Sequence, residues 1–256
     1  MIPARRSPLV ALWRLLRASA HVLRGLWIIR REFGRLTPDQ RALRVREWSR
    51  QMLAIMGVTL VVRGTPPAQG PVLLVANHIS WLDILVMDAA HPARFVSKAD
   101  IKHWPVLGSL ITGAGTLYIE RASRRDAMRV VHQMAAALTA GDTLAVFPEG
   151  TTHDGRTLLP FHANLIQAAI SAHAPALPVA LQYLDGASGA ISDAPLFVGE
   201  TTLLQSVWRT LRADGMQACV HFGEPQRANG RDRRTCAADL QQAVGAMLTA
   251  DSASRR

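Results

Sequence analysis

The stretch VLLVANHISWLDI, residues 72–84, carries the strongest structural signal in the chain. Its first five residues are a continuous apolar run, typical of a strand buried on both faces of a parallel sheet, and a polar turn after Ala76 leads into a helix. His78 lies in that turn, and Asp83 falls in the first helical turn, from which its carboxylate can reach back to the imidazole. A second interpretation stays open, because Ser80 and Asp83 also fit a capping box that leaves His78 as an ordinary turn residue.

The chain around this unit alternates short β-branched runs with helical stretches, which predicts an α/β fold with a mostly parallel central sheet flanked by helices. The expected strands are 58–63, 72–76, 94–97, 116–119, 143–147, 177–183 and 218–222. The expected helices are 81–90, 105–113, 123–140, 162–173, 201–212 and 233–249. We expect this domain to cover residues 57–250, with a frayed tail at 251–256.

Two further stretches place polar residues where a strand ends. In GTLYIER, residues 115–121, Arg121 ends a strand and could bind a phosphate with two parallel hydrogen bonds. Its alternative is a surface ion pair with Glu120 or Asp126.

In LAVFPEGTTHDG, residues 144–155, a buried strand runs into Glu149-Gly150-Thr151-Thr152, and a glycine turn with exposed amides and hydroxyls can hold a phosphate. A plain strand-exit turn explains the same residues, and Glu149 suits a phosphate site only if it contacts Arg121 or a substrate hydroxyl.

A fourth stretch, ALPVALQY at residues 176–183, has Pro178 near the start of a strand, which indicates an edge or a strand beginning. No GxSxG elbow accompanies His78, so the imidazole is expected to act directly on a substrate hydroxyl. The sequence has no HExxH motif or clustered Cys/His signature, and we expect neither a metal nor a bound cofactor.

The net charge of +10 is concentrated at the N-terminus. Residues 1–50 contain 12 Arg and three acidic residues, whereas the rest of the chain is almost neutral. A basic segment on a neutral body fits nucleic acid or an anionic membrane. Aromatic residues are only 5% of the chain, too few for a stacking platform, so we expect no nucleic-acid partner.

Residues 9–29 are apolar but interrupted by Arg14, Arg17 and Arg24. Each Arg near a bilayer centre costs roughly 2.5–3.5 kcal/mol, so a spanning helix is not expected. On a helix these Arg fall with His21 on one narrow arc opposite Leu and Trp, which favours a helix lying on the membrane with Arg toward anionic lipid. The alternative is an ordinary amphipathic helix packed on its own domain. With a second helix at 38–56, residues 1–56 form an expected membrane-associated hairpin, whose contact with the anionic surface runs through 9–35.

Taken in order, NHISWLD, GTLYIER, FPEGTT and LPVA resemble the motifs of the glycerolipid acyltransferases of the 1-acylglycerol-3-phosphate acyltransferase type, over roughly residues 58–225. The resemblance implies His78 as general base and Asp83 as its partner. It also implies substrate contacts, to the acyl acceptor and its phosphate from Gly115, Arg121, Glu149, Gly150 and Thr151, and to the acyl chain from Pro178.

The resemblance implies transfer of a fatty acyl group from acyl-CoA or acyl-carrier protein to a lysolipid hydroxyl, with 1-acylglycerol-3-phosphate as the expected acceptor. It also implies a location on the cytoplasmic face of a membrane, the bacterial inner membrane. The sequence departs from the family pattern at Phe161-His162-Ala163-Asn164, where the family commonly has Phe-Lys and then Gly. Lys98 could replace the missing cation, and lyso-ornithine lipid becomes an alternative acceptor.

Two other functions stay open at this stage. One is a non-enzymatic membrane or nucleic-acid binding module that uses the basic N-terminus. The other is a thioesterase of the same fold, in which water takes the acyl group.

Overall fold

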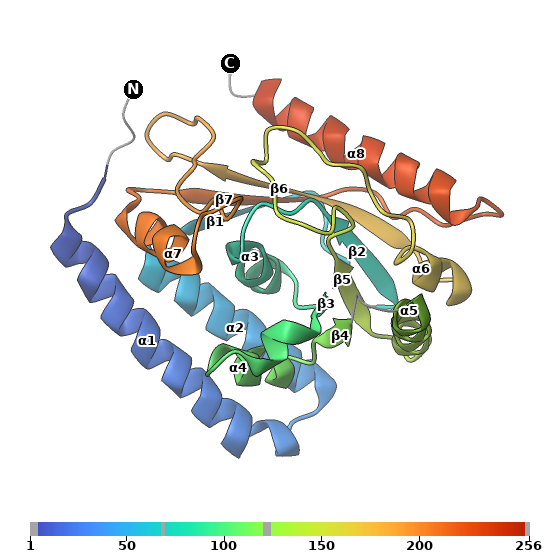
Figure 1. The fold of residues 1–256 in the computed structure, drawn as a ribbon, viewed down its shortest axis with the longest axis horizontal. Coiled ribbons are helices and arrows are strands. Elements are labelled where there is room, and N and C mark those ends of the chain that lie inside the picture. The colour runs from blue at the N-terminus through green and yellow to red at the C-terminus, as the bar shows by residue number, and fades with distance from the viewer. Residues whose placement is uncertain (1–4, 68–69, 120–123, 254–256) are drawn as a thin grey trace.

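The computed structural model describes residues 5–67, 70–119 and 124–253, which form one seven-stranded sheet with helices on both faces (Figure 1). The strand order is β1-β7-β6-β2-β5-β3-β4. The strands are β1 (Thr59–Arg63), β2 (Val72–Ala76), β3 (Arg94–Lys98), β4 (Leu117–Ile119), β5 (Thr143–Val146), β6 (Ala176–Leu184) and β7 (Gln217–Phe222). Neighbouring strands are parallel except β6 and β7. The expected α/β fold with a mostly parallel sheet is confirmed.

The helices form a layer on each face of the sheet (Figure 1). They are α1 (Pro8–Arg31), α2 (Pro38–Met56), α3 (Leu82–Ala90), α4 (Leu107–Gly113), α5 (Arg124–Thr139), α6 (Gln167–Ser171), α7 (Leu203–Arg212) and α8 (Arg233–Ala253), with 3-10 turns at Phe33–Arg35 and Ala99–His103. Because side chains alternate along a strand, Leu74 and Ala76 of β2 pack toward α2 and α3, whereas Leu73 and Val75 pack toward α5 and α8.

The turns that follow β2 and β5 meet at the centre of the sheet. β2 and β5 are parallel, with Val75 opposite Val146, so the turns that follow them lie at the same edge of the sheet. β6 borders β2 on its other side, with Ala76 opposite Val179. The chain leaves β2 toward β3 on one side and leaves β5 toward β6 on the other, and α/β folds bind ligands at such a switch in strand order.

Two elements differ from the sequence prediction by more than two residues. The helix expected at 162–173 is only α6, because residues 163–166 form turns before it and His173, with a φ of 51°, ends it. The tail expected at 251–256 is also wrong at its start. There α8 continues to Ala253, and buried Asp251 accepts a hydrogen bond of 2.5 Å from Arg63 Nη1.

Helix α1 packs on the domain through a mixed side. Of the expected polar arc, Arg14 and His21 face the protein, whereas Arg17 and Arg24 are exposed. Arg14 Nη1 donates to the carbonyls of Leu211 and Ala213 at the end of α7, at 2.8 and 3.1 Å. His21 is buried, and its Nε2 lies 3.0 Å from the carbonyl oxygen of Trp48 in α2.

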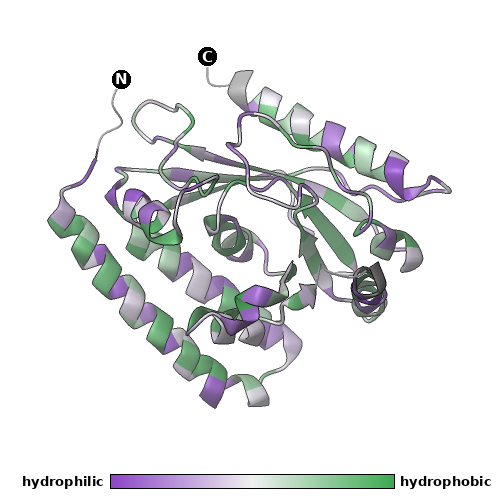
Figure 2. Cartoon of the chain, in the orientation of Figure 1, coloured by the Kyte–Doolittle hydropathy of each residue, from purple (hydrophilic) through white to green (hydrophobic). Residues whose placement is uncertain are grey.

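Part of the apolar surface of α1 is left uncovered, and Figure 2 shows hydrophobic and hydrophilic residues alternating along the helix. The exposed large apolar side chains of α1 are Leu9, Val10, Leu12, Trp13, Leu16, Leu23 and Trp27. The alternative of a helix packed on its own domain holds for the other side of α1, where Ala11 is buried and Leu15, Ala18 and Val22 pack against the core. Within the described part of the chain, no helix has the length and hydropathy needed to cross a bilayer.

Candidate active site

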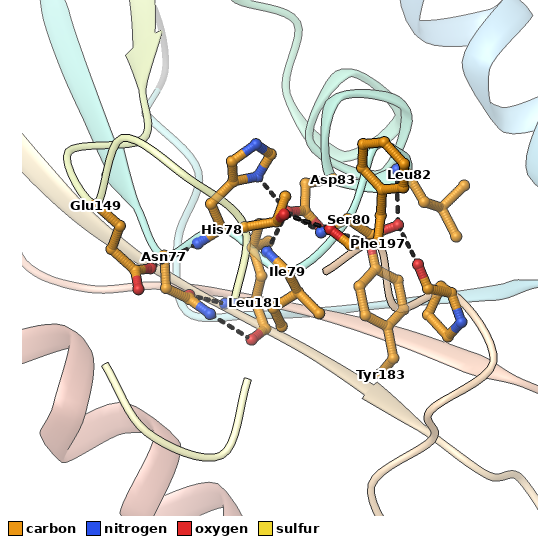
Figure 3. Close-up of polar contacts among 12 residues, drawn as sticks. Asn77, His78, Ile79, Ser80, Leu82, Asp83, Glu149, Leu181, Tyr183 and Phe197 are labelled. Carbon is orange, nitrogen blue, oxygen red and sulfur yellow. Dashed lines mark hydrogen bonds and ion pairs between the residues drawn. The ribbon is translucent and has the colours of Figure 1, made fainter. Parts of the chain in front are cut away.

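The turn after β2 brings His78 and Asp83 into contact, as their spacing predicts (Figure 3). His78 Nδ1 lies 2.7 Å from Asp83 Oδ2. Asp83 is in the first turn of α3 and is completely buried, whereas the His78 side chain keeps 20% of its surface exposed. Because Nδ1 carries the proton shared with the carboxylate, Nε2 holds the free lone pair. Among the described residues, Nε2 has no hydrogen-bond partner, so it is the atom open to a substrate.

Four donors surround the Asp83 carboxylate. Besides His78 Nδ1, Oδ2 accepts the backbone N–H groups of Ile79 at 2.7 Å and Ser80 at 2.9 Å. Oδ1 accepts the hydroxyl of Tyr183 at 2.7 Å. These bonds offset the cost of burying a carboxylate. The capping interpretation also holds in part, since the N–H of Ser80 donates to Asp83 Oδ2 as in a capping box, so one carboxylate binds both the backbone before α3 and the imidazole.

Glu149, from the turn after β5, holds the backbone of the neighbouring turn. Its Oε1 accepts the N–H of His78 at 2.7 Å, and its Oε2 accepts the N–H of Leu159 at 2.9 Å. The side chain is buried, and this burial raises the pKa of Glu149 above its ordinary value, although the two N–H groups partly offset the effect. Both carboxylate oxygens bind backbone amides, so the geometry fits a support for the His78 turn.

Two more contacts fix the orientation of this turn. The side chain of buried Asn77 makes a pair of hydrogen bonds with the backbone of Leu181 in β6, at 2.7 and 3.1 Å. The imidazole of His78 stacks on Phe147, with ring centroids 4.0 Å apart and an angle of 11° between the rings. The ring of His78 is therefore held on one face by Phe147 and at one edge by Asp83.

The loop that continues from Glu149 lies at the same edge of the sheet. Gly150 has a φ of 72°, which favours glycine, and its N–H donates to the carbonyl of Phe147. Thr151 is exposed, and the hydroxyl of Thr152 donates to the carbonyl of Phe197. The structure thus brings Glu149, Gly150 and Thr151 to the side of the His78 turn.

Gly115 and Pro178 lie elsewhere. Gly115 precedes β4, at the opposite edge of the parallel strands, and its carbonyl accepts Arg94 Nε at 2.9 Å. Pro178 is inside the sheet, near the start of β6, and not on an edge strand. By alternation it points to the face opposite Tyr183, toward α8, where it lies beside Gly223 and Met247.

The basic residues expected at the acceptor lie only partly within the described residues. Arg121 lies outside the described residues, and Lys98 is described only as the last residue of β3. His162 is exposed and lines an open cleft of about 350 Å³ beside α8, together with Asn164 and two arginines, Arg233 and Arg234. Within the ranges that the structure describes, no group of three or more His, Cys, Asp or Glu could hold a metal ion.

Sequence reasoning missed Tyr183, Asn77 and Phe147 as parts of the site. Tyr183 is 100 residues from Asp83, and only the register of β6 beside β2 brings the two together. One signal was available, because a tyrosine in an otherwise apolar buried strand needs a partner for its hydroxyl.

The comparisons with known proteins agree with this geometry. The Acyltransferase family matches residues 59–182. A lyso-ornithine lipid O-acyltransferase of Pseudomonas aeruginosa is 39% identical over 82% of this chain and 79% of its own length. A 1-acyl-sn-glycerol-3-phosphate acyltransferase of Neisseria meningitidis is 36% identical over 84% of both chains.

A solved structure has the same fold. The 1-acyl-sn-glycerophosphate acyltransferase of Thermotoga maritima superposes with a TM-score of 0.73 over 94% of both chains, at 19% identity. The non-enzymatic alternative is thereby set aside, because the relatives over most of the chain are named as enzymes. From its motifs, its fold and these relatives, the chain belongs to the acyltransferase family that acts in lipid synthesis.

Proposed function

We propose that the protein transfers a fatty acyl group from an acyl thioester to the free hydroxyl of a lysolipid, with His78 as general base. The observation that carries this proposal is the His78–Asp83 pair at 2.7 Å, with Nε2 free of hydrogen-bond partners among the described residues. Nε2 takes the hydroxyl proton while the oxygen attacks the thioester carbonyl. The tetrahedral intermediate then collapses, the C–S bond breaks, and the imidazolium returns the proton to the leaving thiolate.

Asp83 stabilises the imidazolium during this step. Its carboxylate is buried and its four donors fix its position, so the stabilisation needs no rearrangement at the moment of reaction. Glu149 and Phe147 hold the turn and the ring that carry the base. The chemistry needs no metal or bound cofactor, and the acyl thioester, acyl-CoA or acyl-carrier protein, is a co-substrate.

The first acceptor that we propose is 1-acylglycerol-3-phosphate, which would give phosphatidic acid. A second candidate is lyso-ornithine lipid. It is favoured by His162 in place of the family's usual lysine and by the name of the Pseudomonas relative. We retain Arg121, Gly150 and Thr151 as proposed contacts to the acceptor.

The N-terminal hairpin is proposed to bind an anionic membrane surface through residues 9–35. Support comes from the exposed apolar residues of α1, named above, which lie within a segment of 50 residues that contains 12 Arg. An enzyme on that surface meets its lipid acceptor without extracting it. We propose the cytoplasmic face of a bacterial inner membrane as its location.

The reaction is tested with purified wild type, His78→Ala and, as a matched control, His132→Ala, which alters an exposed histidine of α5. Each protein receives a labelled acyl-CoA or acyl-carrier protein with either lysolipid, or with neither. We expect product from wild type and His132→Ala and none from His78→Ala. Full turnover by folded His78→Ala would refute the mechanism, and release of free fatty acid without acceptor would support the thioesterase instead.

Membrane binding is tested with vesicles of phosphatidylglycerol and phosphatidylethanolamine. Leu16→Glu and Trp27→Glu should each weaken binding about tenfold or more, since burying one such side chain is worth about 1.5–3 kcal/mol. The control is Met128→Glu, which alters an equally exposed residue of α5. Equal binding by all three variants would contradict a role for α1.

A further inference from the structure

Among the described residues, Tyr183 is the one side chain that donates a hydrogen bond to Oδ1 of Asp83, the carboxylate oxygen that does not contact His78. It lies in β6, is 2% exposed, and donates its hydroxyl to Asp83 Oδ1 at 2.7 Å. The other three donors, two backbone N–H groups and His78 Nδ1, all bind Oδ2. Hydrogen bonds to both carboxylate oxygens therefore fix the rotation of the carboxylate about its Cβ–Cγ bond, and Tyr183 supplies the bond to Oδ1.

β6 also holds the turn that carries the base. Leu181 binds the side chain of Asn77 through its backbone, and Tyr183 lies two residues farther along the same strand. Leu181 and Tyr183 belong to the same face of the sheet, so one strand sets the positions of both the His78 turn and the Asp83 carboxylate.

We propose that Tyr183 is a positioning residue that keeps Asp83 Oδ2 directed at His78 Nδ1 throughout the reaction. This role rests on the proposed function of His78 as the base. It goes beyond core packing, because a phenylalanine would fill nearly the same volume without binding Oδ1.

The hydroxyl stays a donor at every working pH. Burial, and then the neighbouring charge of Asp83, raise the pKa of Tyr183 well above its ordinary value. A neutral hydroxyl can bind Oδ1 without competing for the imidazole proton.

The test compares wild type with Tyr183→Phe, which removes one oxygen atom. We expect kcat to fall tenfold to a hundredfold, as for loss of a hydrogen bond to a charged group, with KM for both substrates within twofold. The control is Thr210→Val, which also removes a buried hydroxyl, the one that donates to the carbonyl of Ser206 at 2.9 Å. If kcat falls equally in both variants, the effect is one of stability and the proposal fails.

An NMR measurement makes the result independent of turnover. The Nδ1–H proton of His78, assigned by its loss in His78→Ala, should shift in Tyr183→Phe and stay in place in Thr210→Val. An unmoved signal overturns the role of Tyr183. Activity remaining in His78→Ala would instead refute the proposed function, while the shift would still report on the hydrogen bond.

A second variant keeps the proposal testable if Tyr183→Phe does not fold. The chain has only two tyrosines, so 3-fluorotyrosine incorporated into Tyr118→Phe protein changes Tyr183 alone. The fluorinated ring keeps the hydroxyl but makes it a stronger donor. A changed kcat and a shifted Nδ1–H signal, both relative to unlabelled Tyr118→Phe, support positioning, and no change in either overturns it.

Discussion

Replacing Asp83 by Asn should remove the charge of the carboxylate that binds His78 and keep the hydrogen bonds to His78, Ile79 and Ser80. The N–H groups of Ile79 and Ser80 both point at the Oδ2 position, so the amide oxygen must occupy it. The amide NH₂ then faces the oxygen of Tyr183, which can accept a hydrogen bond. His78 keeps its Nδ1–H bond and its tautomer, so only the charge on its partner is lost.

The expected loss follows from Coulomb's law. An imidazolium and a carboxylate whose charge centres are about 4 Å apart attract each other by about 4 kcal/mol at an effective dielectric constant of ~20. At about 1.4 kcal/mol per factor of ten, a fully formed imidazolium would lose a factor of about 10³. Because the proton is only partly transferred in the transition state, we expect kcat to fall between about 10² and 10³.

The assay measures kcat and KM for acyl transfer, together with the free energy of unfolding in urea. Asp83→Asn should keep both KM values and lose about 1–3 kcal/mol of stability, because the two backbone N–H groups keep their acceptor but the buried Tyr183 hydroxyl loses its own. Asp83→Ala, which leaves two backbone N–H groups without one, should lose about 1–3 kcal/mol for each of them. A decrease of kcat smaller than tenfold would refute the charge argument, and an Asn variant as unstable as the Ala variant would refute the assigned amide orientation.

Three further outcomes follow from buried carboxylates. Burial raises the pKa of Asp88 to about 8, so the native state holds a proton there that the unfolded chain releases near pH 4. The contribution of this protonated side chain to stability is complete below pH 4 and falls by about 1.4 kcal/mol per pH unit up to pH 8. The free energy of unfolding of Asp88→Asn, measured in urea, should therefore rise relative to that of wild type by about 2–3 kcal/mol between pH 5 and 7. A difference that stays constant over this range would contradict the prediction. Glu149→Gln can accept only one of the two backbone N–H groups that Glu149 binds, so we expect the free energy of unfolding to fall by about 1–3 kcal/mol and kcat to fall as well. If neither quantity falls, the support role of Glu149 is contradicted. Asp251→Ala should lower the unfolding free energy by about 1–3 kcal/mol, whereas a residue in a frayed tail would change it by less than about 0.5 kcal/mol.

The sequence was sufficient wherever one local pattern determined the structure. The apolar run before Asn77 and the five-residue spacing to Asp83 predicted a strand, a turn and a His–Asp contact, because all of these form within thirteen residues. The strand and helix alternation predicted the sheet for the same reason. The helix expected at 162–173 was too long, because periodicity does not show that residues 163–166 form turns or that His173 takes a positive φ.

The parts that could not be predicted depend on partners far apart in the chain. Tyr183 joins the site only through strand register, and Glu149 binds backbone amides that no pattern in its own segment reveals. The amphipathic pattern of α1 gave two faces but not which one faces the protein. Arg14 and His21 face the protein because Arg14 bonds to carbonyls at the end of α7 and His21 bonds to Trp48, and these partners are far from α1 in the sequence.

The double use of Asp83 has a consequence for how the family can diverge. Its carboxylate accepts two backbone N–H groups at the start of α3, so a lineage that abandoned the reaction would still be selected to keep it for folding. The imidazole of His78 makes no comparable contribution to the backbone, since its turn is held by Glu149 and Asn77. Descendants that have lost catalysis should therefore retain the aspartate and replace the histidine, and a relative with that combination is a candidate pseudoenzyme.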